Sequence, residues 1–550
     1  MALQNEYLMA SVNLGASFMK SQKFDAIVIG GGHNGLVTAG YLQRSGVKTL
    51  VLEARPVVGG ACKTEEIFPG FMMSTTSYVC SLLRPKIIRD LELEKYGLHF
   101  IERDPSSFTP FPDGRHLTFW SDQKKTVAEI AKFSKKDAEA YPKYEHLLKQ
   151  LADFVEPILM MTPPDPLSNR LGDLWDVAKL GLKARSLKGD LYEKVRILTQ
   201  SCADFLDRWF ESDELKATLA TDGVIGAFAS PHTPGTAYVL LHHVMGETFG
   251  RKGVWAYVRG GMGGITQAMA KSFEAHGGTV RTSAPVAKIL IKDGRAAGVL
   301  LANGEEILGD RVISNVDPRK TFVEMLEPQH LESEFLDRVK SIRYGSATFK
   351  LNLALSDVPN FTALPNVGGK PGPQHNGTIH LSPSMEYIEK AYKDARQGMT
   401  SERPVLECTM ASVLDPTIAP PGKHVMSIFV QYAPYDLKNS SWTDAVKNEF
   451  ADRCIGIIEE YAPGFKNMVE HKHMLSPLDL EQEYGLTGGN IFQGEMTLDQ
   501  LFFMRPLPEC ARYRTPVKDL YMCGAATHPG GGVMGASGHN AAREILRDLN

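Results

Sequence analysis

The chain has 550 residues, 43% of them hydrophobic, and a net charge of −4. These values allow a large core and more than one domain, and they argue against nucleic acid as a partner. Its seven cysteines are dispersed and form no C-x-x-C pair, a pattern typical of a reducing compartment that predicts neither a bound metal nor dithiol–disulfide chemistry. No apolar run reaches about 18 residues, so we expect no transmembrane segment.

Residues 1–22 precede the first predicted strand. They contain one acid, Glu6, and one lysine, Lys20, among several serines and alanines. This segment is acid-poor but lacks the arginines of a mitochondrial presequence. We therefore assign residues 1–22 to an N-terminal tail and leave open whether it is a presequence.

A predicted strand and a glycine-rich loop follow. The apolar run Phe24–Ile29 predicts a buried strand, and the loop after it reads Gly30, Gly31, Gly32, His33, Asn34, Gly35. In this G-x-G-x-x-G pattern the first glycine permits a tight turn, the second lets the backbone approach a pyrophosphate, and the third lets the next helix pack closely. The helix is expected over His33–Ser45, with its positive N-terminal end toward the phosphates.

A second predicted strand, Lys48–Glu53, ends in an acid that follows Gly30 by 23 positions. A carboxylate at this place accepts the hydroxyls of an adenosine ribose. It would repel a 2′-phosphate, so a phosphorylated dinucleotide is disfavoured. A strand, the glycines, a helix, a second strand and a terminal acid in this order predict a dinucleotide site.

The stretch after Glu53 distinguishes FAD from NAD. It contains Ala54, Arg55 and a second glycine pair, Gly59 and Gly60, which nicotinamide dehydrogenases do not need. It resembles the extension of the glutathione-reductase-like FAD family of amine oxidases and carotenoid desaturases. The resemblance implies that these residues wrap the ribose and pyrophosphate of FAD. For Arg55 an ordinary surface cation is the alternative.

The centre of the chain carries a glycine cluster, Gly260–Gly264, before a predicted helix over Ile265–His276. A hairpin beginning near Val286 and a strand over Arg311–Asn315 follow. The glycine cluster is either a turn or a wall of the flavin pocket. The family resemblance places adenine against the backbone at Val286, and a role in the core is compatible with that contact.

The last glycines, Gly530, Gly532 and Gly535, also match G-x-G-x-x-G, but the chain ends at Asn550 and no second strand and acid can follow. We expect a loop before a helix over about Val533–Leu549, whose N-terminus would stabilise the negative charge of reduced flavin. This stretch resembles the C-terminal FAD signature of carotenoid desaturases. The resemblance assigns to FAD the residues Gly524, His528, Pro529, Gly532 and Val533.

Two residues of this loop stay open. Ala525 stands where many related FAD proteins have an acid, so the contact that replaces the carboxylate is in doubt. His528 is a weak candidate for a catalytic acid or base. The alternative, which we favour, is that His528 orders the loop.

Histidines also occur in the segment around residue 240. His242 and His243 are adjacent, and adjacent side chains diverge on a helix or a strand, so a packing or capping role is favoured over metal binding. Asp222 and His232 flank this segment and are candidates for the pocket wall, without an assigned role.

Four further segments, Ser77–Pro85, Ser230–Gly246, Leu414–Gly422 and Gly488–Phe492, extend the resemblance. With the motifs above they are similar to the carotenoid/retinoid (phytoene desaturase-like) FAD oxidoreductase family over residues 24–550. The resemblance implies an α/β fold: a discontinuous, glutathione-reductase-like Rossmann FAD-binding domain with a mixed α+β substrate domain. We expect the FAD-binding parts at 23–90, 251–320 and 501–550, a largely helical insert at 91–250 and the substrate domain at 321–500.

These features predict an FAD-dependent oxidoreductase that transfers a hydride from an unidentified apolar or amine-bearing small molecule to flavin N5. One alternative is an FAD-binding regulatory or interaction protein with weak or no catalysis, in which FAD holds the fold together. A less favoured one is a prenylated-substrate carrier of the GDI type. The family resemblance further implies a mitochondrial matrix location, with the cytoplasm as alternative, and a respiratory-chain protein such as a cytochrome c oxidase subunit as partner.

Overall fold

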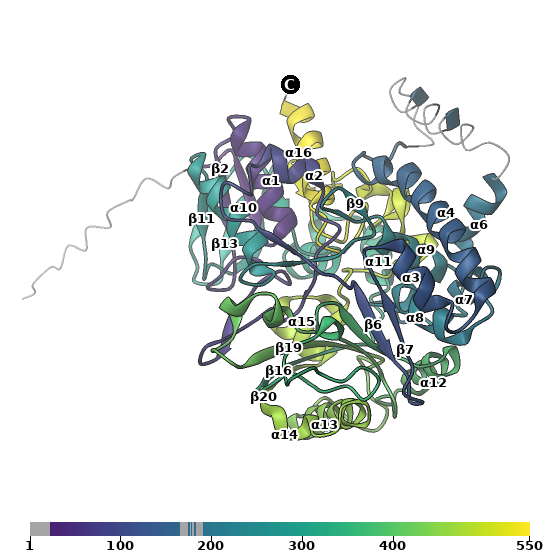
Figure 1. Cartoon of the computed structure of the whole chain (residues 1–550). Coiled ribbons are helices and arrows are strands. Elements are labelled where there is room, and N and C mark those ends of the chain that lie inside the picture. The colour runs from purple at the N-terminus through teal and green to yellow at the C-terminus, as the bar shows by residue number, and fades with distance from the viewer. Residues whose placement is uncertain (1–22, 166–173, 176–177, 179–180, 183–190, 550) are drawn as a thin grey trace, which may run out of the picture.

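The computed structural model describes residues 23–165, 174–175, 178, 181–182 and 191–549. A parallel nucleotide-binding sheet, a larger mixed sheet and a group of helices beside both make up the molecule (Figure 1). The possible presequence, residues 1–22, lies outside the described residues. Within the described ranges, no helix combines the length and the apolar character needed to cross a membrane.

The nucleotide-binding sheet has five parallel strands in the order β11-β2-β1-β15-β21. Their bounds are β11 Thr279–Arg281, β2 Thr49–Leu52, β1 Ala26–Ile29, β15 Val312–Ser314 and β21 Leu520–Met522. The strands therefore come from the beginning, the centre and the end of the chain. The sheet forms only when these three distant stretches meet.

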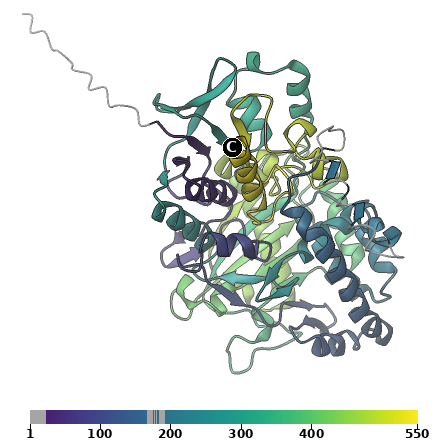
Figure 2. The same ribbon diagram turned by 90° about the horizontal axis from the view of Figure 1, so that it is seen from above.

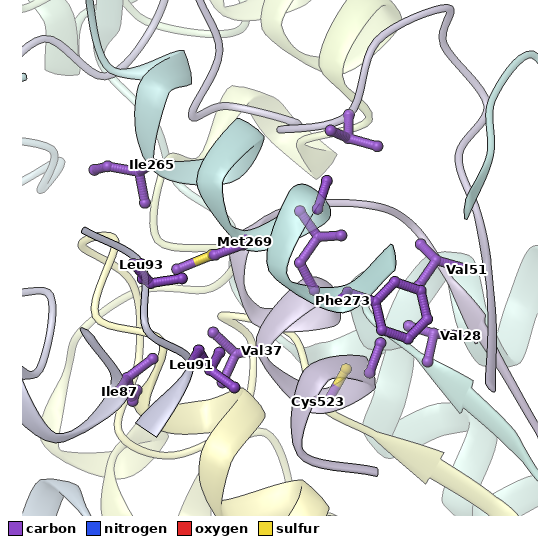
Figure 3. Close-up of a cluster of buried hydrophobic side chains, with 14 of the residues drawn as sticks. Val28, Val37, Val51, Ile87, Leu91, Leu93, Ile265, Met269, Phe273 and Cys523 are labelled. Carbon is purple, nitrogen blue, oxygen red and sulfur yellow. The ribbon is translucent and has the colours of Figure 1, made fainter. Parts of the chain in front are cut away.

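Alternate residues of these strands face two different layers. Val28 and Val51 face a layer of helices. Figure 3 shows the buried cluster that they form with the helical residues Phe273 and Met269. Ile27 and Leu50 face the opposite layer, an antiparallel meander. The helices are α1 His33–Arg44, α2 Pro85–Asp90, α10 Gly263–Ala275 and α16 Ala536–Leu549, and the meander is β12 Val286–Lys292, β13 Arg295–Leu301 and β14 Glu306–Leu308.

Helix α16 lies against α1, so the C-terminal segment is beside the N-terminal one (Figure 2). The approach is close: a Cβ at Gly538 would lie 2.2 Å from the carbonyl oxygen of Asn34. The helix begins at Ala536 rather than at the predicted Val533. The reason is that Val533 has a φ of +56° and Gly535 one of +71°, and a right-handed helix cannot include such residues.

The larger sheet has seven strands in the order β20-β16-β19-β18-β17-β6-β7. Their bounds are β20 Val469–Leu475, β16 Thr348–Leu355, β19 His424–Gln431, β18 Val405–Thr409, β17 Thr378–Leu381, β6 Ser107–Pro110 and β7 His116–Phe119. One face packs on α13, Asp444–Tyr461, through Leu351 and Ile458. Strands β6 and β7 belong to the stretch 91–250, which was expected to be largely helical. Each is only four residues long, too short for a clear periodic signal.

The other described residues of 91–250 are mostly helical and lie to one side of both sheets (Figure 1). Its helices are α3 Gln123–Ile130, α4 Lys135–Leu159, α6 Leu191–Thr199, α7 Cys202–Asp207, α8 Asp213–Val224 and α9 Thr236–Val244. The remaining helices are α11 Ser333–Ser341, α12 Met385–Arg396, α14 Phe465–Met468 and α15 Pro477–Tyr484. Short antiparallel strand pairs complete the fold: β3 Glu65–Phe68 with β4 Phe71–Met73, β5 Phe100–Glu102 with β10 Ala256–Val258, and β8 Glu247–Thr248 with β9 Arg251–Lys252.

Candidate active site

A cavity of about 1530 Å³ extends from the loop after β1 to the seven-stranded sheet and the helical insert. Pockets for a single small ligand usually measure about 300–1,000 Å³. The cavity therefore has room for a dinucleotide together with a second molecule. Twelve of the predicted cofactor contacts line it: Gly30, Gly32, His33, Asn34, Glu53, Ala54, Arg55, Gly59, Gly60, Val286, Gly532 and Val533.

Glu53 is held in place at the nucleotide end of the cavity. Its Oε2 accepts a hydrogen bond from the backbone N–H of Gly31 at 2.8 Å, and its Oε1 accepts one from the N–H of Arg55 at 3.0 Å. The side chain is only 6% exposed. Two backbone bonds thus fix a carboxylate that lines the cavity and has lone pairs left to accept from a ribose.

The glycine loop has no free space for a side chain at Gly32 or Gly35. A Cβ at Gly35 would lie 2.3 Å from the carbonyl oxygen of Gly30, and one at Gly32 would lie 2.9 Å from Asn315 Nδ2. Asn315 in turn donates to the Gly30 carbonyl at 3.1 Å. The bare backbone at the N-terminus of α1 is the surface that a pyrophosphate approaches. Asn315 ends a predicted strand and carried no motif that would have singled it out.

Burial keeps His33, the first residue of α1, neutral, since it lowers the pKa of the imidazole to about 4. The anion-binding character of this helix end therefore comes from backbone N–H groups and the helix dipole rather than from a charged histidine.

Arg55 turns toward the protein rather than into solvent. Its guanidinium carbon lies 4.5 Å from the centre of the Tyr484 ring, and its Nη1 is buried without a hydrogen-bond partner. A buried guanidinium donor without an acceptor fits a phosphate or ribose oxygen. Its Nη2 lies 3.7 Å from Glu65 Oε1, and the contact of Arg55 with FAD stays a prediction.

The meander supplies the next wall. The N–H groups of Ser283 and Ala284 donate to the carbonyls of Arg55 and Glu53, each at 2.9 Å. These bonds bring Val286, the first residue of β12, to the cavity beside the ribose acid. Backbone and side chain of Val286 are thus available to an adenine, and the contact itself stays a prediction.

The C-terminal loop closes over the other end. Gly532 and Val533 line the cavity, and the carbonyl of Gly531 accepts a hydrogen bond from His242 Nε2 at 3.1 Å. Behind the loop, buried Arg505 donates to the carbonyl of Ala525 at 3.0 Å. Burial lowers the pKa of Arg505 to about 10, so it remains a cation at neutral pH and holds the loop through its carbonyls. No motif pointed to Arg505.

His528 does not line the cavity. Its Nε2 donates to the carbonyl of Ile158 at 2.9 Å, and its own carbonyl accepts from the Tyr513 hydroxyl at 2.9 Å. Burial lowers its pKa to about 4. A neutral imidazole outside the cavity, with its Nε2 bonded to a backbone carbonyl, matches the loop-ordering alternative and gives no support to a catalytic role.

Three other predicted contacts lie behind the lining. Gly31 and Gly35 shape the first loop, and a Cβ at Gly524 would lie 2.6 Å from the carbonyl oxygen of Asn315. The cluster Gly260–Gly264 forms a turn that leads into α10 at Gly263: Gly260 N–H donates to Asp415 Oδ2 at 2.6 Å, and none of the glycines lines the cavity. The bare loop, the fixed acid and the unpartnered Arg55 donor together fit FAD, as the sequence predicts.

Polar side chains gather where the seven-stranded sheet borders the cavity. Tyr78 donates its hydroxyl proton to Glu407 Oε2 at 2.9 Å, and His380 Nδ1 lies 3.4 Å from Glu407 Oε1. Lys350 Nζ lies 4.3 Å from the centre of the Tyr78 ring and bonds to Ser427 Oγ. Burial lowers the pKa of Lys350 to about 7, so its charge changes near neutral pH.

This polar group was not predicted from the sequence, and only one signal was present. Lys350 and Asn352 alternate with Leu351 and Leu353 in β16, which puts the two polar side chains on one face of the strand. Glu407 lies in an ordinary hydrophobic strand with no motif around it.

The histidine pair is packed rather than metal-binding. His243 Nδ1 bonds to the carbonyls of Asp222 and Val239, each at 2.9 Å. His243 and Asp222 both line the cavity, whereas His232 is exposed and lies outside it. In the part of the chain that the structure describes, no group of histidine, cysteine and acidic side chains could hold a metal ion.

On the side of the helical insert the cavity lining includes charged residues such as Lys143 and Glu145 and a set of largely apolar side chains, which we call the apolar chamber. Its members are Phe119, Tyr141, Tyr144, Leu148, Leu219, Leu240 and Trp255. Such a wall binds hydrocarbon and keeps water from the reacting atoms. Thiol chemistry is not supported, since all seven cysteines are free and buried, and burial raises the pKa of Cys80, for example, to about 12.

Comparison with known proteins agrees with this geometry. Residues 35–546 match the family described as flavin containing amine oxidoreductase. Pyridine nucleotide-disulfide oxidoreductase domain-containing protein 2 of Rattus norvegicus is 46% identical, over 98% of this chain and 96% of its own length. A limonene dehydrogenase polypeptide of Castellaniella defragrans is 29% identical, over 96% and 95%, and phytoene desaturase (lycopene-forming) of Pseudescherichia vulneris is 25% identical, over 95% and 99%. The predicted resemblance is confirmed.

Solved structures confirm the fold. An oxidoreductase from Methanosarcina mazei aligns with a TM-score of 0.58 at 18% identity, over 96% of this chain and 100% of its own. Cyclohexylamine oxidase from Brevibacterium oxydans aligns with a TM-score of 0.55 at 15% identity, over the same shares of the two chains.

Proposed function

The chain belongs to the flavin containing amine oxidoreductase family and is an FAD-dependent oxidoreductase, and on this premise we propose that it oxidises a C–H bond of an apolar or amine-bearing small molecule. When bound, FAD supplies the acceptor for the two electrons of that bond. The observation that carries the proposal is the continuity of one cavity from the dinucleotide cradle to the apolar chamber.

The chain's own residues have separate tasks in this proposal. Glu53 and the glycine loop hold the dinucleotide, and Arg505 keeps the C-terminal loop in place. The apolar chamber binds the hydrocarbon part of the substrate and excludes water, which positions the reacting carbon. In the polar group around Glu407, Lys350 can hold or release a proton near neutral pH, because burial lowers its pKa to about 7.

The names of similar proteins support two classes of substrate, hydrocarbons and amines. Limonene and phytoene are hydrocarbons, and cyclohexylamine is an amine with an apolar ring. All three are largely apolar, as the chamber requires. We propose limonene and cyclohexylamine as the first probes of the two classes.

The test begins with the purified protein, which should be yellow with absorption maxima near ~375 and ~450 nm, as for a bound flavin. Under anaerobic conditions a probe of the correct class should bleach the flavin, whereas NADPH should not, because the chain has no second complete dinucleotide motif. A well-folded, colourless protein that takes up no added FAD would refute the proposal.

A regulatory flavoprotein without catalysis is distinguished by Gly32→Val. A side chain there meets Asn315, so the variant should lose its flavin and melt at a lower temperature. Cellular effects that persist with this variant would point to the regulatory alternative.

We also propose a mitochondrial matrix location and a respiratory-chain partner such as a cytochrome c oxidase subunit, both supported only by the family resemblance. Fractionation with protease protection should find the protein in the matrix, and cross-linking there should capture the partner. Recovery in the cytoplasm would refute the first proposal.

A further inference from the structure

Asp222 lines the cavity wall, and its carboxylate has no role in the cofactor site described above. It lies near the end of α8 and lines the cavity with Thr218 and Thr221 of the same helix. Its backbone carbonyl, not its carboxylate, accepts the bond from His243. The residue before that histidine, His242, bonds to the C-terminal loop at Gly531. Asp222 is therefore connected to the flavin-side loop through α9.

A second carboxylate, Glu407, lines the same cavity in a very different setting. Its two oxygens are bonded to Tyr78 and paired with His380. His380 Nδ1 also lies 3.5 Å from the hydroxyl of Thr221, which is the neighbour of Asp222 on α8. One cavity thus contains Glu407, whose carboxylate is held by two partners, and Asp222, which lines the wall beside Thr218 and Thr221.

The surroundings of the two carboxylates shift their pKa values in opposite directions. Burial raises the pKa of Asp222 and the charge of Glu407 adds to this, while His243, His380 and Arg103 oppose it. Burial also acts to raise the pKa of Glu407, but the bonds from His380 and Tyr78 outweigh it and keep the pKa below its usual range. The phenols of Tyr78 and Tyr144 and the thiol of Cys202 also interact with Asp222. Two carboxylates whose environments move their pKa values apart in this way serve as a distinct acid and base.

We propose that Asp222 accepts the proton released when the substrate is oxidised, and that Glu407, fixed by Tyr78 and His380, is the permanent anion beside it. This inference rests on the proposed function. One C–H bond of the substrate breaks and its hydrogen leaves with the electron pair as hydride to oxidised flavin, which is reduced by two electrons. The neighbouring C–H or N–H bond gives its proton to an Asp222 oxygen, and its electron pair forms the new C=C or C=N bond.

The first experiment needs no substrate and compares Asp222→Asn with the wild type in thermal unfolding of the FAD-loaded protein. An acid whose folded-state pKa is raised destabilises the fold once the pH exceeds its unfolded pKa of about 3.9. Asn removes this cost. The variant should therefore melt higher than the wild type, by about 1 °C or more at pH 8, and the difference should vanish toward pH 4.

The matched control is Asp207→Asn at the exposed end of α7, where the carboxylate pairs with Lys216 at 2.7 Å. It should show no such rise with pH. If Asp222→Asn instead melts lower than the wild type by the same amount at every pH, Asp222 is a structural hydrogen-bonding residue and the inference is wrong.

The second experiment measures anaerobic flavin bleaching by stopped flow with limonene or cyclohexylamine, whichever reduces the wild type. Asp222→Asn should retain FAD but slow bleaching by about 10²–10⁴-fold. Glu407→Gln should move the acid side of the pH profile to lower pH, because it removes the negative charge that favours protonated Asp222. Asp207→Asn should match the wild type.

Bleaching by Asp222→Asn at the wild-type rate and with the wild-type pH profile would overturn the inference while the proposed function stands. Failure of the proposed function has a different signature, a folded protein that binds no FAD. If neither probe bleaches the wild type, a melting difference between Asp222→Asn and Asp207→Asn that does not grow with pH still overturns the inference.

Discussion

Gly35→Ala is the sharpest test of the cofactor loop. Gly35 lies in the first turn of α1, where a Cβ would be 2.3 Å from the carbonyl oxygen of Gly30 and 3.1 Å from the side-chain amide of Asn315. The first contact is with backbone, so it cannot be relieved by a rotamer change. The helix and the loop must separate by several tenths of an ångström.

The magnitude follows from two opposing effects. Replacing a helical glycine by alanine stabilises a protein by about 1 kcal/mol when space allows. Overpacking of this kind costs about 1–3 kcal/mol, and more when the backbone moves. We therefore expect Gly35→Ala to destabilise the protein by up to about 2 kcal/mol. Because the movement displaces the N–H groups that face the pyrophosphate, FAD affinity should fall at least about tenfold, which corresponds to 1.4 kcal/mol.

Gly456→Ala is the matched control, since it is the same substitution within helix α13, where a Cβ meets nothing within 4 Å. It should raise the melting temperature and leave FAD binding unchanged. The assays are thermal unfolding of the apo and FAD-loaded proteins and titration of the apoprotein with FAD by flavin fluorescence. If Gly35→Ala binds FAD as tightly as the wild type and has the same melting temperature, the loop is not packed as described and the prediction is wrong.

Three further variants address other parts of the cavity. Glu53→Ala leaves the N–H groups of Gly31 and Arg55 without their acceptor, at about 1–3 kcal/mol, and should weaken FAD binding; an unchanged dissociation constant would contradict the assignment. Lys350→Met should stabilise the protein, and its gain in stability over the wild type should grow as the pH falls from about 10 to 7. In this range the lysine binds a proton in the unfolded chain, with a pKa of about 10.4, but not in the folded protein, where burial lowers its pKa. A difference in melting temperature that stays constant across this range would refute the prediction. His528→Gln loses the hydrogen bond to Ile158, so the free energy of unfolding should fall by about 1 kcal/mol. The pH profile of flavin bleaching should not change, and a shifted profile would indicate a catalytic role for His528.

The sequence by itself determined the cofactor loop. Strand β1, the glycines, α1 and Glu53 lie within one short stretch, and their chemistry is local: positive φ at Gly30, close backbone approach at Gly35, and an acid at the end of the next strand. Residue types at fixed spacing carry such information without reference to the rest of the chain.

The tertiary structure alone decided the opposite wall. Tyr78 and Glu407 are 329 positions apart, and Arg505 reaches loops that the sequence does not associate with it. His528 likewise bonds to the carbonyl of Ile158, a residue 370 positions away. Long-range pairs leave no periodic or local signal, because they meet only when the two sheets close around the cavity. Whether a buried carboxylate becomes a bonded anion or a proton acceptor therefore depends on neighbours that only the folded chain provides.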